Sequence, residues 1–485
     1  MKIKKIIQDL PVEVYKGSRD IDITALCAHS KYVAPGNLFI AKRGKLDDGA
    51  KYIDEAIAAG AVAILSDLPD PSLRNITQLI CADVRKLEAQ IAARFYGDPS
   101  KELFTIGVTG TNGKTTTTYM IKHLLDALGG NIGLIGTIEY VLGKYHFDAE
   151  LTTPDILTNQ KLLREMVKYH CDGCAMEVSS HGLVQGRVEG IDYDVALFTN
   201  LTQDHLDYHK SMEGYAGAKR ILFQSLKPEG TAIVNLESPW GEEMLKGCRA
   251  HTITYGFSNK ADLFADDIQL SSKEAYFTVH YRKESVRMRA PIVGRFNVLN
   301  ILGAVATALV RGHTLVQIAP CLENFPCVRG RFERVENSHG LEVYVDFAHT
   351  PDALEKVLSS LAEFKKSQVL LVFGAGGDRD REKRAQMGRV ASKWADFSFI
   401  TSDNPRSEDP LSICKDIVAG FEGKNYLVEV DRRAAIEKAI LQAGPGDLLL
   451  IAGKGHETYQ TFAHQTIPFD DRKVAYEILS EVRCV

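Results

Sequence analysis

A glycine-rich loop is the feature of this sequence that most clearly predicts chemistry. It reads Gly-Val-Thr-Gly-Thr-Asn-Gly-Lys-Thr-Thr at residues 107–116, after the apolar run Leu103–Val108 and before a helical pattern. Glycines let backbone N–H groups surround phosphate oxygens, and a helix N-terminus adds partial positive charge. Lys114 would neutralise the β- and γ-phosphates of ATP, and the Thr115 hydroxyl would reach Mg²⁺. The loop lacks the standard glycine at Val108, but the order of strand, loop and helix favours this site over a glycine-rich turn with a surface lysine.

Two groups of ionisable side chains follow other apolar runs. Glu177 lies in the run Ala175–Val178, where a carboxylate could hold the Mg²⁺ of a nucleotide; the alternative is a capping or ion-paired glutamate. The segment Asn200–His209 contains four ionisable groups within six residues. Such a cluster after a strand favours a functional site over ordinary surface.

Four polar motifs follow predicted strands in the last third of the chain. They are Asp346-Phe-Ala-His-Thr-Pro-Asp352, Gly374–Asp380, Asp403-Asn-Pro-Arg406 and Gly453–Glu457. The carboxyl ends of parallel strands share one edge of a sheet, so these motifs should meet there. Arg379 and Arg406 could each bind a carboxylate with two hydrogen bonds. One such motif could be an ordinary turn, but four at one edge favour a binding site.

The elements that must position these residues divide into three regions. Residues 1–99 end in turn formers at Tyr96–Ser100, and residues 100–329 alternate apolar strands with helical patterns. Residues 330–485 show the most regular alternation of strands and helices. We therefore predict an α/β protein of three domains, with a central parallel-sheet ATPase domain and a C-terminal doubly wound, Rossmann-like domain.

Composition narrows the class of protein. The chain has 485 residues, 45% of them apolar and 25% charged, which is ordinary for a soluble protein of several domains. A net charge of −5 does not favour a partner such as nucleic acid or a membrane surface. We find no apolar run that would span a membrane and no signal peptide, and nine cysteines fit free thiols. We expect a cytoplasmic monomer with small-molecule substrates.

Two short motifs are better explained as ordinary structure. Cys171 and Cys174 form a lone CxxC, and a zinc site would need a second pair, so Cys174 is predicted to begin a buried strand. Asn259-Lys-Ala-Asp262 has the form of a guanine-reading motif. A GTPase also needs a DxxG after a second strand, so a polar turn is the simpler explanation.

Taken in order, these segments resemble the Mur ligases, the enzymes that build the peptide of bacterial cell-wall precursors. The match runs from Pro35-Gly-Asn-Leu-Phe through the loop at 107–116 to Gly453–Glu457. The resemblance implies that ATP phosphorylates a glutamyl carboxylate to an acyl phosphate, which an amine then attacks. The Asp403–Arg406 motif implies the type that adds meso-diaminopimelate, rather than lysine, to UDP-N-acetylmuramoyl-L-alanyl-D-glutamate. An arginine there suits the extra carboxylate of diaminopimelate.

The resemblance also implies a role for individual residues. ATP would be bound by Gly110, Thr111, Asn112, Gly113, Lys114, Thr115, Thr116, Asn297, Asn300, Arg331 and Asp346. The UDP-muramoyl substrate would be bound by Ser30, Thr152, Thr153, Ser179, Gln185 and Arg187. Diaminopimelate would be bound by Arg379, Asp403, Asn404, Pro405, Arg406, Gly453 and Glu457. Mg²⁺ would be held by Thr115, Glu177, His205 and Lys219.

Lys219 is the residue for which the resemblance changes the prediction most. Composition alone predicts an exposed lysine on a helix. The family carbamylates the matching lysine with CO₂. The resemblance therefore implies that Lys219 is a catalytic residue, together with Lys114 and His205. A bare ammonium would repel Mg²⁺, whereas a carbamate supplies oxygen ligands.

Two other functions stay open from the sequence. Folylpolyglutamate synthetase would share the ATP loop and the lysine, but not the first domain or the motif at Asp403–Arg406. A regulatory nucleotide-binding switch would bind nucleotide without ligase turnover.

Overall fold

The computed structural model describes residues 1–44 and 48–481 of the chain. Helices cover β-sheets along these residues, so the predicted α/β class is confirmed. The chain folds into two compact units. The first unit contains residues 1–107, 130–194 and 225–230, and the second contains residues 108–129, 195–224 and 231–485. The domain boundaries after residues 99 and 329 stay a prediction.

The N-terminal sheet of the first unit has helices on both faces. Its strand order is β1 (Glu13–Lys16), β5 (Thr77–Ile80), β4 (Ala63–Ser66), β3 (Leu38–Ile40) and β2 (Leu26–Cys27). The strands pair in parallel except for β1, and the helices are α1 (Ile3–Ile6), α2 (Ile53–Ala58) and α3 (Val84–Phe95). Leu38 and Ile40 pack in the core that includes α1 and α3, while Phe39 packs in the core that includes α2. This two-sided burial explains the continuous apolar strands.

The largest sheet contains the strands of the predicted central domain. Its order is β16 (Glu284–Ala290), β15 (Ala275–Tyr281), β14 (Leu263–Leu270), β13 (His251–Gly256), β12 (Leu226–Asn235), β11 (Tyr193–Phe198), β6 (Phe104–Thr109), β10 (Gly173–Glu177), β7 (Ile132–Ile135), β8 (Glu139–Leu142) and β9 (Tyr145–Asp148). The helices are α4 (Lys114–Ala127), α5 (Ile156–Lys168), α6 (Ser180–Val184), α7 (Leu206–His209), α8 (Met212–Gln224), α9 (Gly241–Met244), α10 (Arg295–Val310) and α11 (Leu315–Leu322).

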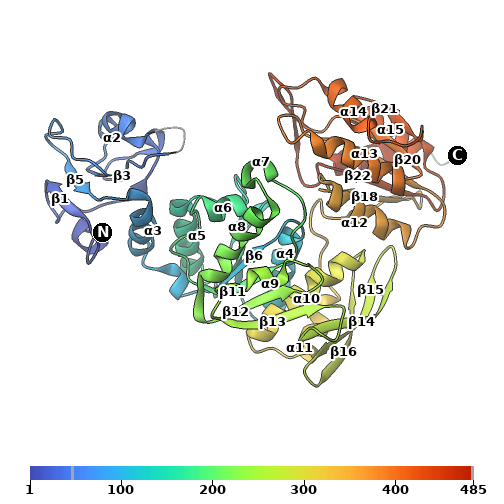
Figure 1. The fold of residues 1–485 in the computed structure, drawn as a ribbon, viewed down its shortest axis with the longest axis horizontal. Coiled ribbons are helices and arrows are strands. Elements are labelled where there is room, and N and C mark those ends of the chain that lie inside the picture. Colours follow the sequence, from blue (N-terminus) through green and yellow to red (C-terminus); the bar gives the residue numbers. More distant parts are fainter. Residues whose placement is uncertain (45–47, 482–485) are drawn as a thin grey trace. The chain divides into compact units, whose positions relative to one another are not determined.

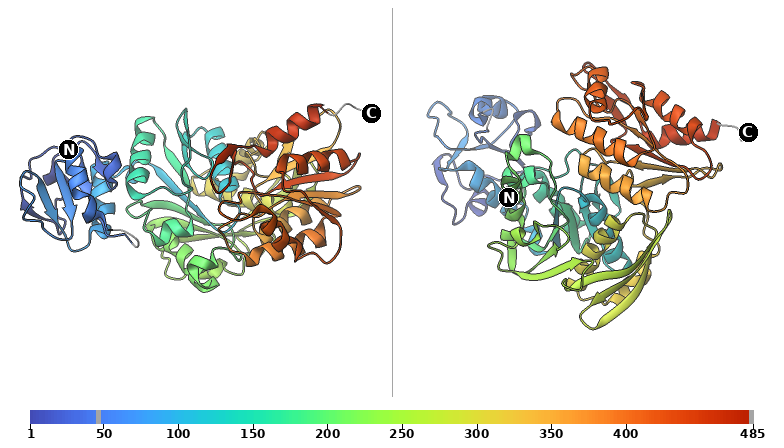
Figure 2. Two further views of the ribbon diagram at one scale, coloured as in Figure 1. Left: turned by 90° about the horizontal axis from the view of Figure 1, so that it is seen from above. Right: turned by 45° about the vertical axis from the view of Figure 1, so that its right-hand side comes forward.

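The prediction of a parallel central sheet holds for several pairs but misses two antiparallel ribbons. Strand β10 pairs in parallel with β7, and β13 pairs in parallel with both β12 and β14. Strands β7–β9 and β14–β16 instead pair antiparallel, the latter as the yellow-green ribbon in the right view of Figure 2. Strand β9 is exposed along its whole length, and β14 mixes buried, half-buried and exposed residues, so neither carries the apolar run that marks a buried strand.

The C-terminal sheet, in the second unit, is doubly wound as predicted. Its order is β17 (Glu333–Val335), β18 (Glu342–Asp346), β22 (Leu448–Ala452), β19 (Val369–Phe373), β20 (Phe397–Ile400) and β21 (Tyr426–Val428). All these strands are parallel except β17. One face packs against α12 (Pro351–Ala362), α13 (Glu382–Trp394) and α14 (Pro410–Val418), and the other against α15 (Arg432–Gln442) and α16 (Asp471–Glu481) (Figure 1). Strand β17, helix α16 and the hairpin of β23 (Tyr459–Thr461) and β24 (Thr466–Pro468) were not predicted.

The cysteines and helices of the structure bear on two predictions from composition, reduced cysteines and the lack of a membrane-spanning run. No disulfide joins cysteines within the described residues, and Cys174 is buried in β10, which confirms the prediction for the CxxC motif. Along residues 1–44 and 48–481, the helices lack the length and apolar character that a membrane crossing requires.

A buried ion pair between α15 and α16 predicts a large effect on stability. The side chains of Arg432 and Asp471 are both 0% exposed, and Nη2 of Arg432 lies 2.7 Å from Oδ2 of Asp471. Replacing Asp471 with alanine would leave a buried guanidinium unpaired, so we expect the free energy of unfolding to fall by about 3–5 kcal/mol. Urea denaturation measures this loss.

The neighbouring pair provides a matched control. Arg433 and Glu477 join the same two helices at 2.7 Å, but about half of each side chain is exposed. Replacing Glu477 with alanine should cost about 0–1 kcal/mol. Equal losses in the two variants would contradict the stabilising role of the buried pair.

Candidate functional site

The glycine-rich loop connects β6 to α4 and leaves no space for larger side chains. A Cβ at Gly110 would lie 1.9 Å from the Thr199 hydroxyl oxygen, and a Cβ at Gly113 would lie 2.5 Å from Oδ1 of Asn300. Nζ of Lys114 donates to the carbonyl oxygens of Gly110 and Thr111, both at 2.9 Å. The ammonium therefore folds back over the loop at the start of α4, where the helix dipole also favours an anion.

Asn200 holds this loop in place, a role that the sequence did not predict. Its Oδ1 accepts from the backbone N–H of Asn112 at 3.0 Å, and its Nδ2 donates to the carbonyl oxygen of Asn112 at 3.1 Å. Its carbonyl oxygen accepts from the N–H of Thr111 at 2.8 Å. The sequence does hold a sign of this role, because Asn200 comes two residues after the end of the apolar strand β11 and begins the polar segment at 200–209.

Lys219 is buried, so the exposed position that composition predicts is wrong. It lies on the buried face of α8 with 1% of its surface exposed, and its Nζ donates to the carbonyl oxygen of Gly110 at 2.8 Å. Burial, and then the charge of Lys114, holds the pKa of Lys219 well below its ordinary value. A larger fraction of the amine is therefore neutral than in an exposed lysine, and the neutral amine is the form that reacts as a nucleophile.

His205 and Asp204 form a pair before α7. His205 has a left-handed backbone with φ +55°, and its Nε2 lies 3.4 Å from Oδ2 of Asp204. Burial alone would raise the pKa of Asp204, but the charges of His205, His349 and Lys383 lower it. Asp204 is therefore held as a carboxylate near neutral pH.

Glu177 ends strand β10 in the first unit and is the centre of a threonine-rich cluster. Its Oε1 accepts from the N–H of Thr137 at 2.7 Å, and its Oε2 accepts from the Thr137 hydroxyl at 3.0 Å. The Thr137 and Thr152 hydroxyl oxygens are 3.1 Å apart, and the Thr153 hydroxyl donates to the carbonyl oxygen of Glu177 at 2.9 Å. Thr137 was not predicted, although it follows β7 at a strand end.

Most of the residues predicted for the UDP-muramoyl substrate adjoin this cluster. The N–H of Ser179 donates to the Thr153 hydroxyl at 3.0 Å, and Nη1 of Arg187 donates to the carbonyl oxygen of Thr153 at 2.9 Å. Nε of Arg187 donates to Oε1 of Gln185 at 2.9 Å. Ser30 lies elsewhere in the first unit, buried at the start of the 3-10 turn Ser30–Tyr32.

A cavity of about 320 Å³ lies in the second unit, beside the helix that follows the glycine-rich loop. Its lining includes Thr116, Met120, Ile292, Asn297, Phe325 and Arg331. Nη2 of Arg331 donates to the Thr115 hydroxyl at 3.0 Å, which places the pocket next to the glycine-rich loop. The lining combines apolar side chains with charged ones, among them Lys273, Arg334 and Glu336.

Asn300 and Asp346 do not line this cavity but form hydrogen bonds with residues that do. Nδ2 of Asn300 donates to Oδ1 of Asn297 at 3.0 Å, and both residues lie on the buried helix α10. The two carboxylate oxygens of Asp346 accept from the N–H groups of Phe332 at 2.7 Å and Ala348 at 2.8 Å. Burial raises the pKa of Asp346, which these hydrogen bonds and Arg331 oppose.

The four C-terminal motifs meet at one edge of the sheet, as predicted. The N–H of Gly453 donates to the carbonyl oxygen of Asp346 at 3.0 Å, and Nδ2 of Asn404 donates to Oε2 of Glu457 at 2.8 Å. Nη1 of Arg406 donates to the carbonyl oxygen of Gly377 at 2.7 Å. These hydrogen bonds therefore bring residues of all four motifs, among them Arg406 and Glu457, to the same edge of the sheet.

Asp403 and Pro405 complete the packing of this edge, and Lys454 is an unpredicted member. A Cβ at Gly453 would lie 2.6 Å from Oδ2 of Asp403, and one at Gly377 would lie 1.9 Å from the carbonyl oxygen of Pro405. Nζ of Lys454 is buried and donates to Oε2 of Glu457 at 2.9 Å. It lies inside the Gly453–Glu457 motif, but its burial could not be read from composition.

Two of the four predicted Mg²⁺ ligands, Thr115 and Glu177, carry oxygen donors of the kind that this ion binds. Mg²⁺ binds oxygen, and usually takes one or two carboxylates while waters and substrate phosphates fill the other positions. The Thr115 hydroxyl and the Glu177 carboxylate are such donors; Thr115 and His205 belong to the second unit and Glu177 to the first. Within the described residues, no group of three or more His, Cys, Asp or Glu side chains forms a metal site of protein ligands alone.

Comparisons with known proteins cover nearly the whole chain. Three domain families match: "Mur ligase family, catalytic domain" at residues 22–96, "Mur ligase middle domain" at 108–308 and "Mur ligase, glutamate ligase domain" at 330–455. The chain is 43% identical to UDP-N-acetylmuramoyl-L-alanyl-D-glutamate–2,6-diaminopimelate ligase 1 of Clostridium acetobutylicum, over 99% of this chain and 100% of that protein. It is 41% identical to the ligase of the same activity from Chlamydia trachomatis, over 99% of each.

Solved structures give the same fold. A structure of a UDP-N-acetylmuramoyl-L-alanyl-D-glutamate–2,6-diaminopimelate ligase matches with a TM-score of 0.71 and 32% identity, over 99% of each chain. Folylpolyglutamate synthase of Mycobacterium tuberculosis, complexed with ADP and AMPPCP, matches 76% of this chain and 92% of its own, with a TM-score of 0.64 and 16% identity. The second likeness shows the fold alone.

Proposed function

Since this chain belongs to the Mur ligase family, we propose that it joins meso-diaminopimelate to the D-glutamate of UDP-N-acetylmuramoyl-L-alanyl-D-glutamate in peptidoglycan precursor synthesis, using ATP. The observation that carries this proposal is the sheet edge where Arg379, Arg406 and Glu457 lie on converging motifs. Diaminopimelate has a carboxylate and an amino group at each end, and such an edge offers partners for both.

In the proposed reaction, the γ-phosphoryl group of ATP passes to the glutamyl carboxylate and forms an acyl phosphate. The amine of diaminopimelate attacks the acyl carbon, and inorganic phosphate leaves from a tetrahedral intermediate. Charge accumulates on the phosphoryl oxygens during transfer, so fixed positive groups lower the barrier. Lys114 is such a group, because its ammonium already lies over the loop that would bind the phosphates.

Mg²⁺, when bound, would neutralise part of the phosphate charge. We propose that Thr115, Glu177 and His205 hold it, together with Lys219 in its carbamylated form. The lowered pKa of Lys219 favours this modification, because the neutral amine attacks the carbon of CO₂ and then loses a proton.

We propose that different regions of the chain bind different substrates. Residues 1–99 and the cluster around Glu177 would bind the UDP-muramoyl dipeptide, and the middle region would bind ATP. Residues 330–485 would bind the amino acid. We further propose that the enzyme acts in the cytoplasm as a monomer, where its free thiols stay reduced.

ADP release under steady-state conditions tests this function. We expect release only when ATP, UDP-muramoyl dipeptide and meso-diaminopimelate are all present. A folylpolyglutamate synthetase would instead release ADP in the presence of a folate and glutamate. For a nucleotide-binding switch, ADP release would depend neither on these two substrates nor on the muramoyl dipeptide and diaminopimelate. Release without the muramoyl dipeptide would overturn the proposal.

Replacing Arg406 with alanine should weaken binding of diaminopimelate. A charge-assisted hydrogen-bond pair contributes about 1.5–3 kcal/mol, so we expect the KM for diaminopimelate to rise about 10- to 100-fold while the KM for ATP stays unchanged. Arg389, exposed on α13 of the same sheet, provides the control for loss of a cation. An unchanged KM in the Arg406→Ala variant would exclude this arginine as the carboxylate partner.

A further inference from the structure

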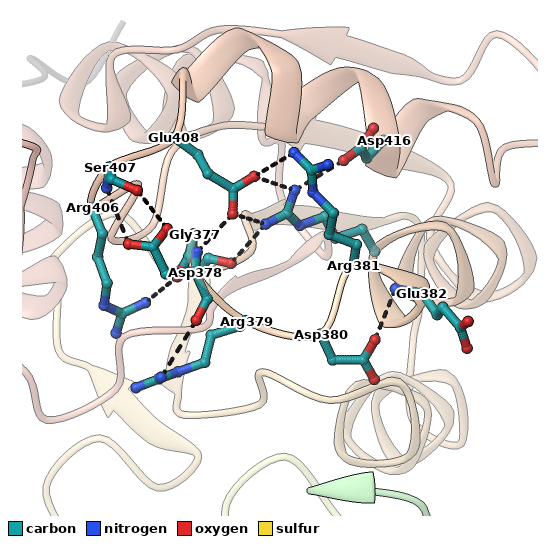
Figure 3. A network of polar contacts seen from close by, with 12 residues as sticks. Gly377, Asp378, Arg379, Asp380, Arg381, Glu382, Arg406, Ser407, Glu408 and Asp416 are labelled. Atoms are coloured by element: carbon teal, nitrogen blue, oxygen red, sulfur yellow. Dashed lines mark hydrogen bonds and ion pairs between the residues drawn. The ribbon is translucent and has the colours of Figure 1, made fainter. Parts of the chain in front are cut away.

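The Glu408 carboxylate joins the two loops that carry the arginines of the proposed amino-acid site. Its Oε1 accepts from the N–H of Asp378 at 2.6 Å and from Nη2 of Arg384 at 2.8 Å (Figure 3). Its Oε2 accepts from Nη1 of Arg384 at 2.9 Å and from Nη2 of Arg381 at 3.0 Å. Asp378 belongs to the loop of Arg379, and Glu408 belongs to the loop of Arg406, so one carboxylate links both.

Arg384 holds the Glu408 carboxylate with two hydrogen bonds. Its side chain is 0% exposed, and a guanidinium out of contact with water needs charged partners in good geometry. Besides Glu408, it donates to Oδ2 of Asp416 at 2.9 Å and to the carbonyl oxygen of Gly376 at 3.3 Å. The hydrogen bonds from Arg384 lower the pKa of Glu408 to about 2, so this acceptor stays charged at neutral pH.

The two loops also hold each other in unusual backbone conformations. Asp378 and Arg406 have φ of +53° and +52°, a region that residues other than glycine rarely adopt. The Ser407 hydroxyl donates to Oδ1 of Asp378 at 2.6 Å, and Nη1 of Arg406 donates to the carbonyl oxygen of Gly377 at 2.7 Å. Such conformations persist only where neighbouring residues enforce them. Here the contacts between the two loops stabilise the backbone of both.

We propose that Glu408 is a positioning residue that sets the selectivity of the enzyme for an amino acid with a second carboxylate. By fixing the loop of Arg379 against the loop of Arg406, it holds both guanidinium groups at a constant separation. This inference rests on the proposed function. Glu408 does not touch the substrate itself; it acts through the two loops.

Selectivity is the property that separates this role from a general loss of structure. Lysine has an amino group but no carboxylate at its far end, so it gains nothing from an arginine placed there. Loosening the loops therefore weakens binding of diaminopimelate and leaves use of lysine nearly unchanged. The ratio of kcat/KM for the two amino acids should fall, whereas a partly unfolded enzyme would lose both activities equally.

The test is the variant Glu408→Gln, which keeps the side-chain volume but replaces one acceptor oxygen with an N–H₂ group that cannot accept from Arg384 or Asp378. We expect the KM for meso-diaminopimelate to rise about tenfold and the diaminopimelate-to-lysine ratio of kcat/KM to fall about tenfold. The kcat and the KM for ATP should stay within about twofold, because the phosphate loop is not part of this network.

Asp416→Asn is the matched control, because Asp416 binds the same guanidinium from α14 without touching either loop in the network of Figure 3. It should lower thermal stability but leave the diaminopimelate-to-lysine ratio unchanged. If both variants shift the ratio equally, or if Glu408→Gln leaves it unchanged, the inference is overturned. If Glu408→Gln does not fold, Ser407→Ala decides: a lowered ratio supports the inference and an unchanged one overturns it. A wild-type enzyme without diaminopimelate-dependent turnover would instead overturn the proposed function.

Discussion

Replacing Lys114 with alanine should lower the rate of ADP formation by about 10²–10³-fold, the loss expected when one preorganised charge is removed from a transition state. The ammonium lies within 2.9 Å of the carbonyl oxygens of Gly110 and Thr111, at the N-terminus of α4. Gly110 and Gly113 have no space for a Cβ, so their packing fixes the backbone that positions this charge. The measurement is kcat with saturating substrates.

Lys122→Ala provides the control for this substitution. Lys122 lies further along the same helix and pairs with Asp126 at 2.8 Å. A partly exposed i,i+4 pair of this kind contributes about 0.3–0.5 kcal/mol and lies away from the loop, so the rate should stay near that of the wild type. A Lys114→Ala variant that retains full activity would contradict the assignment of the loop to phosphate.

Replacing Lys219 with methionine should lower kcat by at least about 10²-fold, because the carbamate that we propose to bind Mg²⁺ could not form. Removal of dissolved CO₂ from the wild-type enzyme should lower its activity in the same direction. Arg220→Met, at the next position of α8, removes a cation that pairs with Glu243 and should leave kcat unchanged.

The stability of the Lys219→Met variant shows whether its lower kcat comes from the missing carbamate or from unfolding. The pKa of Lys219 is lowered in the folded protein, so between that pKa and about 10.5 the unfolded chain binds a proton that the folded protein does not. The free energy of unfolding contributed by this residue therefore rises with pH across that window. Methionine removes the cost of burying an amine, so the variant should be at least as stable as the wild type at neutral pH. An inactive variant that is also much less stable would leave burial, not carbamylation, as the role of Lys219.

Local patterns were enough to predict the parallel strands of the C-terminal sheet and the helices between them. Its parallel strands are buried on both faces, so each appears as an apolar run, and the helices between them begin after good capping residues such as Thr350, Asp409 and Asp431. Since parallel strands end at one edge, the meeting of the four motifs followed from topology alone.

The rest depends on contacts between distant parts of the chain. The burial of Lys219 under Gly110, 109 residues away, follows from how α8 packs and not from the composition of the helix. Asn200 and Thr137 are single polar residues after strands, and only the partner that each one binds reveals its role. The antiparallel ribbons were missed because their exposed strands have no apolar run.

The product of a competition reaction tests the central claim most directly. The enzyme would be incubated with ATP, UDP-N-acetylmuramoyl-L-alanyl-D-glutamate and equal concentrations of meso-diaminopimelate and L-lysine, and the nucleotide-linked products would be identified by mass spectrometry. We predict the diaminopimelate tripeptide as the main product. A main product that contains lysine, or no new peptide product, would contradict the account.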